Sequence, residues 1–275
     1  MALVRVLHVS DLHAGAHEEP EVEAALRALV AETEPELVVA SGDLTHRNSR
    51  ADHERAAALL RSLGRELLVI PGNHDMPTLP PARFAHTFSE FERVWGETEP
   101  VYRSERIVAC GLNSARPWLY QEGVVRRAQV ERAARELAQA PEGALRLVAV
   151  HHHLVAAPWR TMKLPVFRRG YMLTALVEAG AELVVSGHVH QSSVVERREF
   201  EVTEGPVRGA VVATAPGLGR PRARRKGEAR GFHLYEADEQ TLRVLTHAWH
   251  GDEWALIAER RFPRGPGLLE VDASD

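Results

Sequence analysis

The alternation of short apolar runs with longer amphipathic stretches is the feature that most limits how this chain can fold. It extends over the first two-thirds of the sequence. Six apolar runs are continuous enough to be strands buried on both faces: Leu3–Val9, Leu37–Ala40, Leu67–Ile70, Ile107–Leu112, Leu145–Val150 and Leu183–Val185. Helical periodicity predicts four helices between them: Glu21–Glu32, Ala51–Leu63, Arg126–Ala138 and Arg169–Ala179. Strands that alternate with helices of this length predict βαβ units and a mostly parallel sheet.

Beyond about residue 192 the pattern changes to strands without helices between them. The predicted strands are Ser193–Glu196, Gly209–Thr214, Gly231–Tyr235, Leu242–His247 and Trp254–Arg261. We expect them to form an antiparallel continuation, which gives a core of two sheets in an α/β fold. No linker or repeat of fixed period divides the sequence, so residues 1–262 are predicted to form one domain. Residues 263–275 are rich in Pro and Gly and then acidic, and are predicted to be a flexible tail.

Charge and composition argue against several classes of protein. The 275 residues carry 34 Lys and Arg against 38 Asp and Glu, a formal net charge of −4, which argues against a protein that coats nucleic acid through bulk charge. The single cysteine, Cys110, excludes an intramolecular disulfide framework and fits a reducing compartment. No apolar run approaches the roughly 20 residues that span a bilayer, and the N-terminus lacks the pattern of a signal peptide. We therefore expect a cytoplasmic protein without a membrane partner.

One segment departs from this overall balance of charge. It contains six basic residues: Arg220, Arg222, Arg224, Arg225, Lys226 and Arg230. A solvated loop is one interpretation of such a run. A flap that meets an anionic substrate is the other.

Polar side chains follow five of the predicted strands, at the point where each strand ends. They are Asp11 and His13, then Asp43, then Asn73, His74 and Asp75, then His151, His152 and His153, and finally His188 and His190. The carboxyl ends of the strands form the edge at which open α/β sheets hold their ligands. Each short motif is common by chance, but five of them in order are not. We therefore expect these side chains to form one site.

The side chains in these motifs indicate the chemistry of a metal site. Neutral imidazole and carboxylate oxygen suit Zn, Mn, Fe or Co, and the absence of clustered cysteines excludes a thiolate site. Gly42, Gly72 and Gly187 stand within the motifs, where glycine lets the backbone turn sharply and leaves room for metal and substrate.

The ordered motifs D-x-H, G-D, G-N-H-[DE], H and G-H-x-H resemble those of the calcineurin-like metallophosphoesterase superfamily. They extend from Asp11 to His190, about two-thirds of the chain. More narrowly, the chain resembles the bacterial subfamily of cyclic-nucleotide and glycerophosphodiester phosphodiesterases, through the phrases Ser10-Asp11-Leu12-His13, Gly42-Asp43-Leu44-Thr45 and Pro71-Gly72-Asn73-His74-Asp75. The resemblance implies two mixed β-sheets packed as a sandwich and flanked by helices, a four-layer αββα arrangement, with a dinuclear metal site at the strand ends.

The resemblance also implies a ligand set for two divalent transition-metal ions, Mn, Fe or Zn. The family pattern gives Asp11, His13 and His190 to one ion. It gives Asn73, His151 and His188 to the other ion, with Asp43 bridging the two. Family members usually have His-His-Pro or a similar phrase where this chain has His151-His152-His153-Leu154. We choose His151 because it directly follows the predicted strand, and His152 stays open as the alternative ligand.

Further residues receive roles around this expected metal site. In the family, the histidine at the position of His74 reaches the scissile phosphate, to stabilise the transition state or to protonate the leaving group. Asp75 is expected to orient His74 or the backbone of the motif, with a loop cap as the other interpretation. Arg116 follows a strand end and is either a phosphate-binding arginine on the rim of the site or a surface arginine. Further rim or pocket candidates are His17, His46, Trp159, Arg160 and Lys163.

The sequence therefore predicts a dinuclear metal-dependent phosphodiesterase that cleaves small soluble diesters by attack of a hydroxide held between the two ions. Cyclic nucleotides and glycerophosphodiesters are the substrates the resemblance suggests. A phosphomonoesterase and a DNA nuclease of the same superfamily are the alternatives, and a nucleic-acid partner is not favoured. A non-enzymatic scaffold of this fold is less favoured still, because all five motifs are intact. A homodimer stays open.

Overall fold

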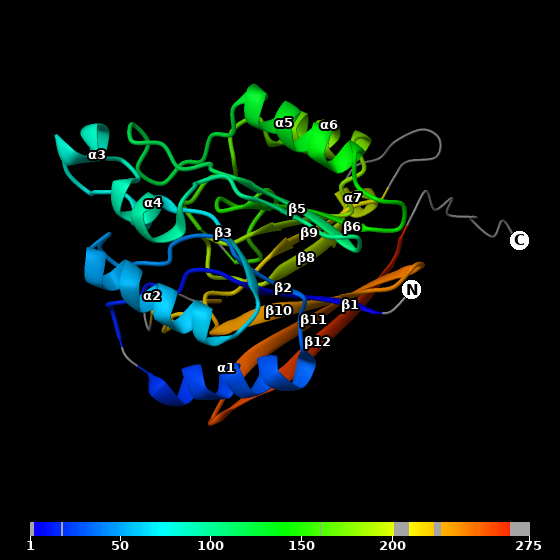
Figure 1. Ribbon diagram of the computed structural model, residues 1–275, viewed down its shortest axis with the longest axis horizontal. Coiled ribbons are helices and arrows are strands. Elements are labelled where there is room, and N and C mark those ends of the chain that lie inside the picture. Colours follow the sequence, from blue (N-terminus) through cyan, green and yellow to red (C-terminus); the bar gives the residue numbers. More distant parts are fainter. Residues whose placement is uncertain (1–2, 18, 160, 201–208, 223–226, 265–275) are drawn as a thin grey trace, which may run out of the picture.

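The protein is described here from a computed structural model, which covers residues 3–17, 19–159, 161–200, 209–222 and 227–264. Two six-stranded sheets pack face to face and are covered on their outer faces by helices (Figure 1). This is the α/β sandwich of mixed sheets that the resemblance implies, and the fold class is confirmed.

The first sheet has the strand order β12-β11-β10-β1-β2-β3. Its strands are β1 (Val4–Val9), β2 (Leu37–Ala40), β3 (Glu66–Val69), β10 (Gly231–Ala237), β11 (Thr241–His250) and β12 (Glu253–Pro263). The first three run parallel to one another, and β10 then pairs antiparallel with β1. The C-terminal hairpins therefore extend the N-terminal parallel strands, as expected.

The second sheet has the strand order β4-β5-β6-β7-β9-β8. Its strands are β4 (Val101–Arg103), β5 (Ile107–Leu112), β6 (Leu145–Val150), β7 (Leu183–Ser186), β8 (Ser193–Glu196) and β9 (Val211–Thr214). The expectation of a purely antiparallel continuation is wrong for β9, which pairs parallel with β7 and antiparallel with β8. The chain leaves β7, forms the edge strand β8 first, and then inserts β9 between the two.

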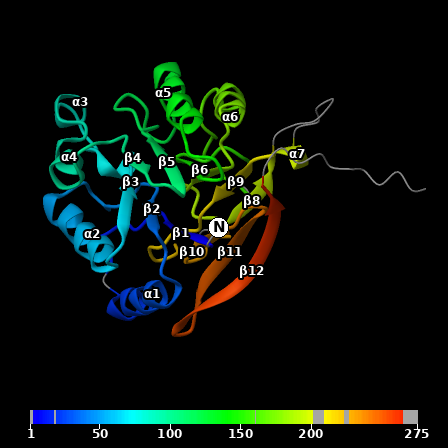
Figure 2. The ribbon, with the colours of Figure 1, turned by 45° about the vertical axis from the view of Figure 1, so that its right-hand side comes forward.

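The helices lie on the two outer faces of the sandwich, and the views of Figures 1 and 2 agree on this. Their bounds are α1 (Pro20–Thr33), α2 (Arg50–Ser62), α3 (Ala82–Ala85), α4 (Ser89–Trp95), α5 (Arg127–Ala138), α6 (Arg169–Glu178) and α7 (Arg197–Phe200), with a 3₁₀ turn η1 (Asn73–Asp75). Apolar side chains of α1, α2 and α4 pack on the first sheet, and those of α5 and α6 pack on the second. A third apolar cluster fills the space between the sheets.

The four long helices were predictable because their apolar patterns are strong, whereas the short helices were not. Helices α3 and α7 have four residues each and carry no helical period of their own. The expectation of strands without helices after residue 192 is therefore wrong at α7. No helix among the described residues is long and apolar enough to cross a membrane. The cytoplasmic location, the homodimer and the single domain stay predictions, and residues 265–275 of the expected tail lie outside the described residues.

Candidate metal centre

Three groups of histidines and aspartates form one continuous cluster at the carboxyl ends of the strands. The ligand atoms within each group all lie within 4.8 Å of one another. The groups are Asp11, His13 and His190, then His13, Asp43 and His74, and finally Asp43, His151 and His188. His13 and Asp43 each belong to two groups. The group of His13, Asp43 and His74 therefore joins the other two groups, which form the two ends of the cluster.

The backbone of the motif loops adopts an uncommon conformation. Five of the predicted ligands have a positive φ: Asp11 (52°), His13 (49°), Asp43 (51°), His188 (71°) and His190 (57°). Residues other than glycine rarely adopt this left-handed region, and such strain concentrates at functional sites. Hydrogen bonds between the loops stabilise this backbone conformation. The N–H of Asp11 donates to the carbonyl oxygen of Gly42 at 2.9 Å, and the N–H of His13 donates to that of Asp43 at 3.0 Å.

Asp11 and two imidazoles form one end of the cluster. His190 Nε2 lies 3.1 Å from Asp11 Oδ1 and 3.2 Å from His13 Nε2. The other Asp11 oxygen accepts a 2.9 Å hydrogen bond from the backbone N–H of His188. Burial would raise the pKa of Asp11, but His190 and its neighbours hold that pKa well below its usual range. Burial lowers the pKa of His13 to about 4, so its imidazole is neutral at physiological pH, as a metal ligand must be.

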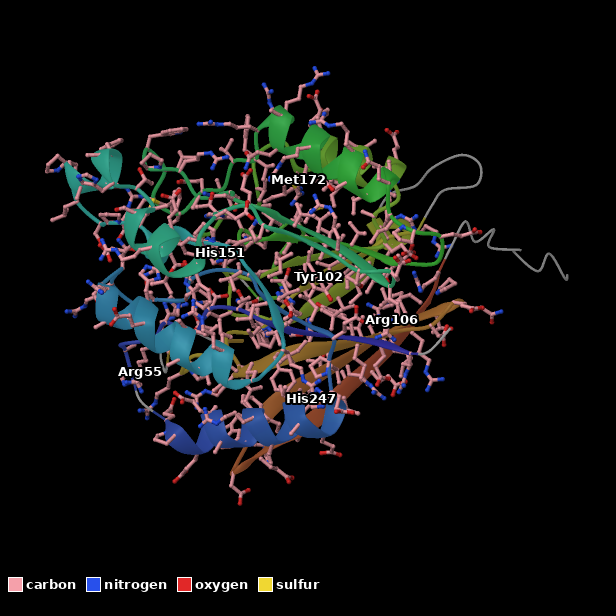
Figure 3. All side chains as sticks on the ribbon, viewed as in Figure 1. Arg55, Tyr102, Arg106, His151, Met172 and His247 are labelled. Carbon is pink, nitrogen blue, oxygen red and sulfur yellow. The ribbon has the colours of Figure 1, made fainter. Side chains whose placement is uncertain are left out.

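His151 stands at the other end of the cluster, after β6 (Figure 3). Its Nδ1 donates to the carbonyl oxygen of Ser41 at 2.8 Å, which leaves Nε2 3.3 Å from Asp43 Oδ1 and 3.2 Å from His188 Nδ1. Burial opposes a charged ring, but the Asp43 carboxylate outweighs it and raises the pKa of His151 to about 9. A bound cation can take the place of the proton between His151 Nε2 and the Asp43 carboxylate.

His152, the alternative ligand, belongs to none of the three groups. Its Nδ1 lies 2.7 Å from Ser114 Oγ, and its side chain is fully buried. Burial lowers the pKa of His152 well below its usual value. The placement therefore favours His151 as the ligand, although no bound ion tests the choice.

Asp43 occupies the shared middle of the cluster. Its Oδ1 accepts the backbone N–H of His74 at 2.8 Å, and its Oδ2 lies 4.0 Å from His13 Nε2. Burial raises the pKa of Asp43, but the surrounding imidazoles, His151 foremost, hold it well below its usual range. Asp43 is thus an ionised carboxylate between two groups of imidazoles, which is the position a bridging ligand requires.

The unpartnered polar atoms of the cluster fit divalent cations. Buried polar atoms are normally hydrogen-bonded. Among the described residues, Asp11 Oδ1 and Asn73 Oδ1 are buried and make no hydrogen bond, although Asp11 Oδ1 is close to His190. Two pairs of ring nitrogens also face each other at 3.2 Å. Imidazole, carboxylate and amide donors of this kind suit Mn, Fe or Zn.

Glycine is required at all three motif positions, Gly42, Gly72 and Gly187, because other groups approach its Cα closely. A Cβ on Gly187 would lie 1.8 Å from Ser10 Oγ and 2.6 Å from Asp11 Oδ2. Gly42 combines a positive φ of 95° with a virtual Cβ 2.7 Å from His151 Nδ1. The sharp turn predicted for the motif glycines is thus specific to Gly42, whereas Gly187 is needed for space.

His74 and Asp75 follow Asn73 in η1 but lie in different surroundings. His74 is half-buried, and its ring centroid lies 4.8 Å from that of His13. Asp75 is fully buried, and its oxygens accept hydrogen bonds from the N–H groups of Gly72, Leu44 and Thr45 at 2.8 to 3.1 Å. Asp75 therefore holds the two motif loops together, and we assign it a positioning role rather than contact with substrate.

The structure does not place Arg116 on the rim of the cluster. Its side chain is buried, and its guanidinium donates to Gln129 Oε1 at 2.6 Å and to the carbonyl oxygen of Ala115 at 2.8 Å. Gln129 in the first turn of α5 therefore draws Arg116 toward the helix layer. Its burial excludes the interpretation of Arg116 as a surface arginine, and a contact with phosphate stays a prediction.

Four of the remaining candidates line a cavity of about 210 Å³ that opens beside the cluster. His17 and His46 line it, as expected for rim residues, and so do Arg220 and Arg222. Trp159 and Lys163 do not line it, and Lys163 donates instead to the carbonyl oxygen of His188. Arg160, Arg224, Arg225 and Lys226 lie outside the described residues.

Sequence reasoning missed the two serines that orient the rings of His151 and His152. Ser41 acts through its carbonyl oxygen and Ser114 through its hydroxyl. A backbone carbonyl carries no sequence signal, so Ser41 could not have been found from its residue type. Ser114 directly follows Asn113 after a strand end, which was a weak indication of a polar site.

Comparison with known proteins gives one family and several related folds. Residues 4–192, more than half of the chain, match the family model of the calcineurin-like phosphoesterases. A Synechococcus protein named "probable cyclic nucleotide phosphodiesterase" is 26% identical over 180 residues, which cover 63% of this chain and 65% of that protein.

Two solved structures are similar in fold at low sequence identity. The purple acid phosphatase PPD1 from yellow lupin superposes with a TM-score of 0.70 at 12% identity, over 96% of this chain and 54% of that one. A dimetal phosphatase from Danio rerio has a TM-score of 0.63 at 11% identity, over 95% of this chain and 99% of that one. The chain spans less than two-thirds of the Synechococcus and lupin proteins. The structural likenesses show the fold.

Proposed function

We propose that this chain, which belongs to the calcineurin-like phosphoesterase family, is a metal-dependent phosphohydrolase that cleaves phosphodiesters of small soluble substrates. The observation that carries the proposal is the pair of ligand groups joined through Asp43. Two-metal sites of this kind are typical of phosphoester hydrolysis by direct attack of water, which needs no protein nucleophile.

The residues that would hold the two ions are divided between the ends of the cluster. Asp11, His13 and His190 would hold one, whereas Asn73, His151 and His188 would hold the other, and Asp43 would contact both. Two bound Mn, Fe or Zn ions would supply Lewis-acid chemistry, which lowers the pKa of water and neutralises charge on the phosphate.

The protein's own groups position the reaction. The Ser41 carbonyl fixes the ring of His151, and the His188 amide fixes the carboxylate of Asp11. His74 is half-buried and lines the cavity, so its imidazole can meet a phosphate ester there. We propose that His74 stabilises the transition state or protonates the leaving oxygen, which typically contributes about 10²–10⁴-fold to the rate.

Diesters are proposed over monoesters because of sequence likeness. The local phrases around Asp11, Asp43 and Asn73 resemble the phosphodiesterase subfamily, and a relative carries that name. A nuclease has less support. Within the described part of the basic loop, Arg222 pairs with Glu228, and Arg230 pairs with Glu19, which reduces the cationic surface that a polynucleotide would need.

The test is a panel of phosphomonoesters and phosphodiesters, ranked by kcat/KM with protein reconstituted with Mn²⁺. We expect hydrolysis of small diesters that a chelator abolishes and Mn²⁺ restores. A higher kcat/KM for monoesters would replace the diester assignment with a phosphomonoesterase. Absence of metal-dependent hydrolysis of any ester would overturn the proposed function.

A further inference from the structure

The cavity of about 210 Å³ shares three histidines with the cluster, His13, His74 and His190. Beyond them it extends between α1 and α2 and is bordered by residues 218–220 and 222. A molecule bound at the cluster through its phosphate can therefore place one ester group in this cavity. The side chains that line the cavity determine which ester group it can accept.

The walls of the cavity are largely apolar. Leu12, Val22, Leu26, Leu59 and Leu218 line it, together with three alanines at 14, 16 and 56. Val22 and Leu26 lie on the buried side of α1, and Leu26 packs in the apolar cluster between that helix and the first sheet. The cavity is thus an extension of a hydrophobic core, and a polar alcohol placed in it would lose hydrogen bonds to water.

Five charged side chains line the cavity, Glu19, Glu23, Arg55, Arg220 and Arg222, and three of them pair with side chains outside its lining. Glu19 pairs with Arg230, and Arg222 pairs with Glu228. Glu23 Oε2 lies 3.7 Å from Arg27 on the next turn of α1. A paired carboxylate or guanidinium attracts a second charged group on the substrate only weakly, so these residues do not make the cavity a second phosphate site.

The volume of the cavity fits a single ring system. A cavity of about 150 Å³ lined by aliphatic and aromatic side chains takes up benzene, so one of about 210 Å³ accommodates a ring with a short linker. The imidazoles of His17 and His46 also line this space and offer flat faces to such a ring.

We propose that this cavity is the specificity subsite for one ester group of the substrate, and that it selects an apolar ring-bearing group over glycerol or a second charged phosphate. Leu59, which is half-buried on α2, and Val22 and Leu26, on α1, are its specificity-determining residues. The inference rests on the proposed hydrolase function, because the ring enters the cavity only when the phosphate lies at the cluster.

The test compares methyl benzyl phosphate with glyceryl methyl phosphate, both followed by ³¹P NMR with Mn²⁺-reconstituted protein. Both esters have alkyl alcohols, so the comparison reports recognition rather than the leaving ability of an aryl group. The wild-type protein should prefer the benzyl ester by about tenfold or more in kcat/KM, as expected when a hydrophobic pocket receives a matching group.

Substitution at Leu59 tests whether the cavity causes the preference for the benzyl ester. Leu59→Trp, which fills the cavity, should reduce the benzyl-to-glyceryl ratio about tenfold. The matched control is Ala58→Trp, because Ala58 is exposed on the same helix and does not line the cavity. This control should keep the wild-type ratio. If Leu59→Trp does not fold, Leu59→Ala replaces it, and the lost contact should lower the ratio by about fourfold or more, since one buried methylene group contributes about fourfold.

The outcomes separate the subsite from the enzyme activity. Metal-dependent hydrolysis of both esters at equal kcat/KM, or equal losses for both esters in the Leu59 variants, would overturn the subsite and leave the proposed function standing. Hydrolysis of neither ester, together with failure of the wider ester panel, would overturn both.

Discussion

The Nδ1 atom of His151 lies 2.8 Å from the carbonyl oxygen of Ser41. His151 follows β6 of the second sheet, whereas Ser41 follows β2 of the first, so this hydrogen bond joins the two sheets at the edge that carries the cluster. It also fixes the orientation of the ring, because an Nδ1 that donates to Ser41 leaves Nε2 as the nitrogen that faces Asp43 and His188. The packing of the sandwich therefore determines which nitrogen can bind metal.

Substitution of the adjacent histidines should separate the ligand from its neighbour. We expect His151→Ala to lose about one of two bound metal equivalents, because its Nε2 faces the cluster. His152→Ala should retain both, since its Nδ1 lies beside Ser114 instead. Elemental analysis after dialysis against limiting Mn²⁺ measures this. Loss of metal from His152→Ala alone would show that the neighbouring histidine is the ligand.

His74 should affect turnover without affecting metal content. Its side chain belongs to the middle ligand group but also lines the cavity, so the structure permits either role. We expect His74→Ala to lower kcat by about 10²-fold or more on esters with poor leaving groups, and by less on nitrophenyl esters that need no proton on departure. Two metal equivalents should remain. A missing equivalent would make His74 a ligand.

Two glycines provide a matched test of close packing in the site. Gly187→Ala places a Cβ 1.8 Å from Ser10 Oγ, so the loop that carries His188 and His190 must shift. We expect loss of bound metal and a free energy of unfolding lowered by about 1–3 kcal/mol. Gly170, in the first turn of α6, has nothing within 4 Å of its virtual Cβ. Gly170→Ala should keep metal and stability, measured by the same titration and denaturation; equal effects would contradict the packing argument.

His233 should make the fold sensitive to acid. Burial lowers its pKa to about 3, and the ring lies 3.2 Å from the hydroxyl of Tyr235 and 3.0 Å from that of Ser192. Because the pKa in the unfolded chain is about 6.5, the unfolded state binds more protons between these values. The contribution of His233 to the free energy of unfolding is therefore fully present above about pH 6.5. It falls as the pH falls toward 3, by up to about 1.4 kcal/mol per pH unit.

The measurement is urea denaturation of His233→Gln at pH 7 and pH 5. This variant keeps a hydrogen-bonding side chain that does not titrate, so it should lose about 1–2 kcal/mol less than the wild type between these pH values. His250→Gln is the control because His250 is exposed, and it should behave as the wild type does. An unchanged pH dependence in His233→Gln would mean that this histidine does not sense acid.

The fold was predictable where burial is continuous along the chain. β2, β5 and β6 have the predicted bounds, because each is a mainly apolar run that is buried along most of its length. The direction of β9 was not predictable, since it depends on a partner strand about 30 residues earlier rather than on local sequence. Long-range pairing carries no signal within a single strand.

The site shows the same division between local and long-range information. The motif residues were found because they follow strand ends in order. Arg116 obeys the same local rule, yet its guanidinium bonds to Gln129, a contact that no local pattern reveals. The choice between His151 and His152 depends on Ser41 and Ser114, and the cavity depends on the spacing of α1 and α2. These features follow from tertiary packing and needed the structure.

The central claim, a dinuclear site centred on Asp43, is tested most directly by measuring metal stoichiometry and diester turnover on the same samples of wild type and Asp43→Asn. We predict two metal equivalents and chelator-sensitive turnover in the wild type. In Asp43→Asn we predict a folded protein by circular dichroism that has lost turnover, because among the described residues Asp43 is the only carboxylate that belongs to two of the three ligand groups. Full turnover in Asp43→Asn with unchanged metal content would contradict the account.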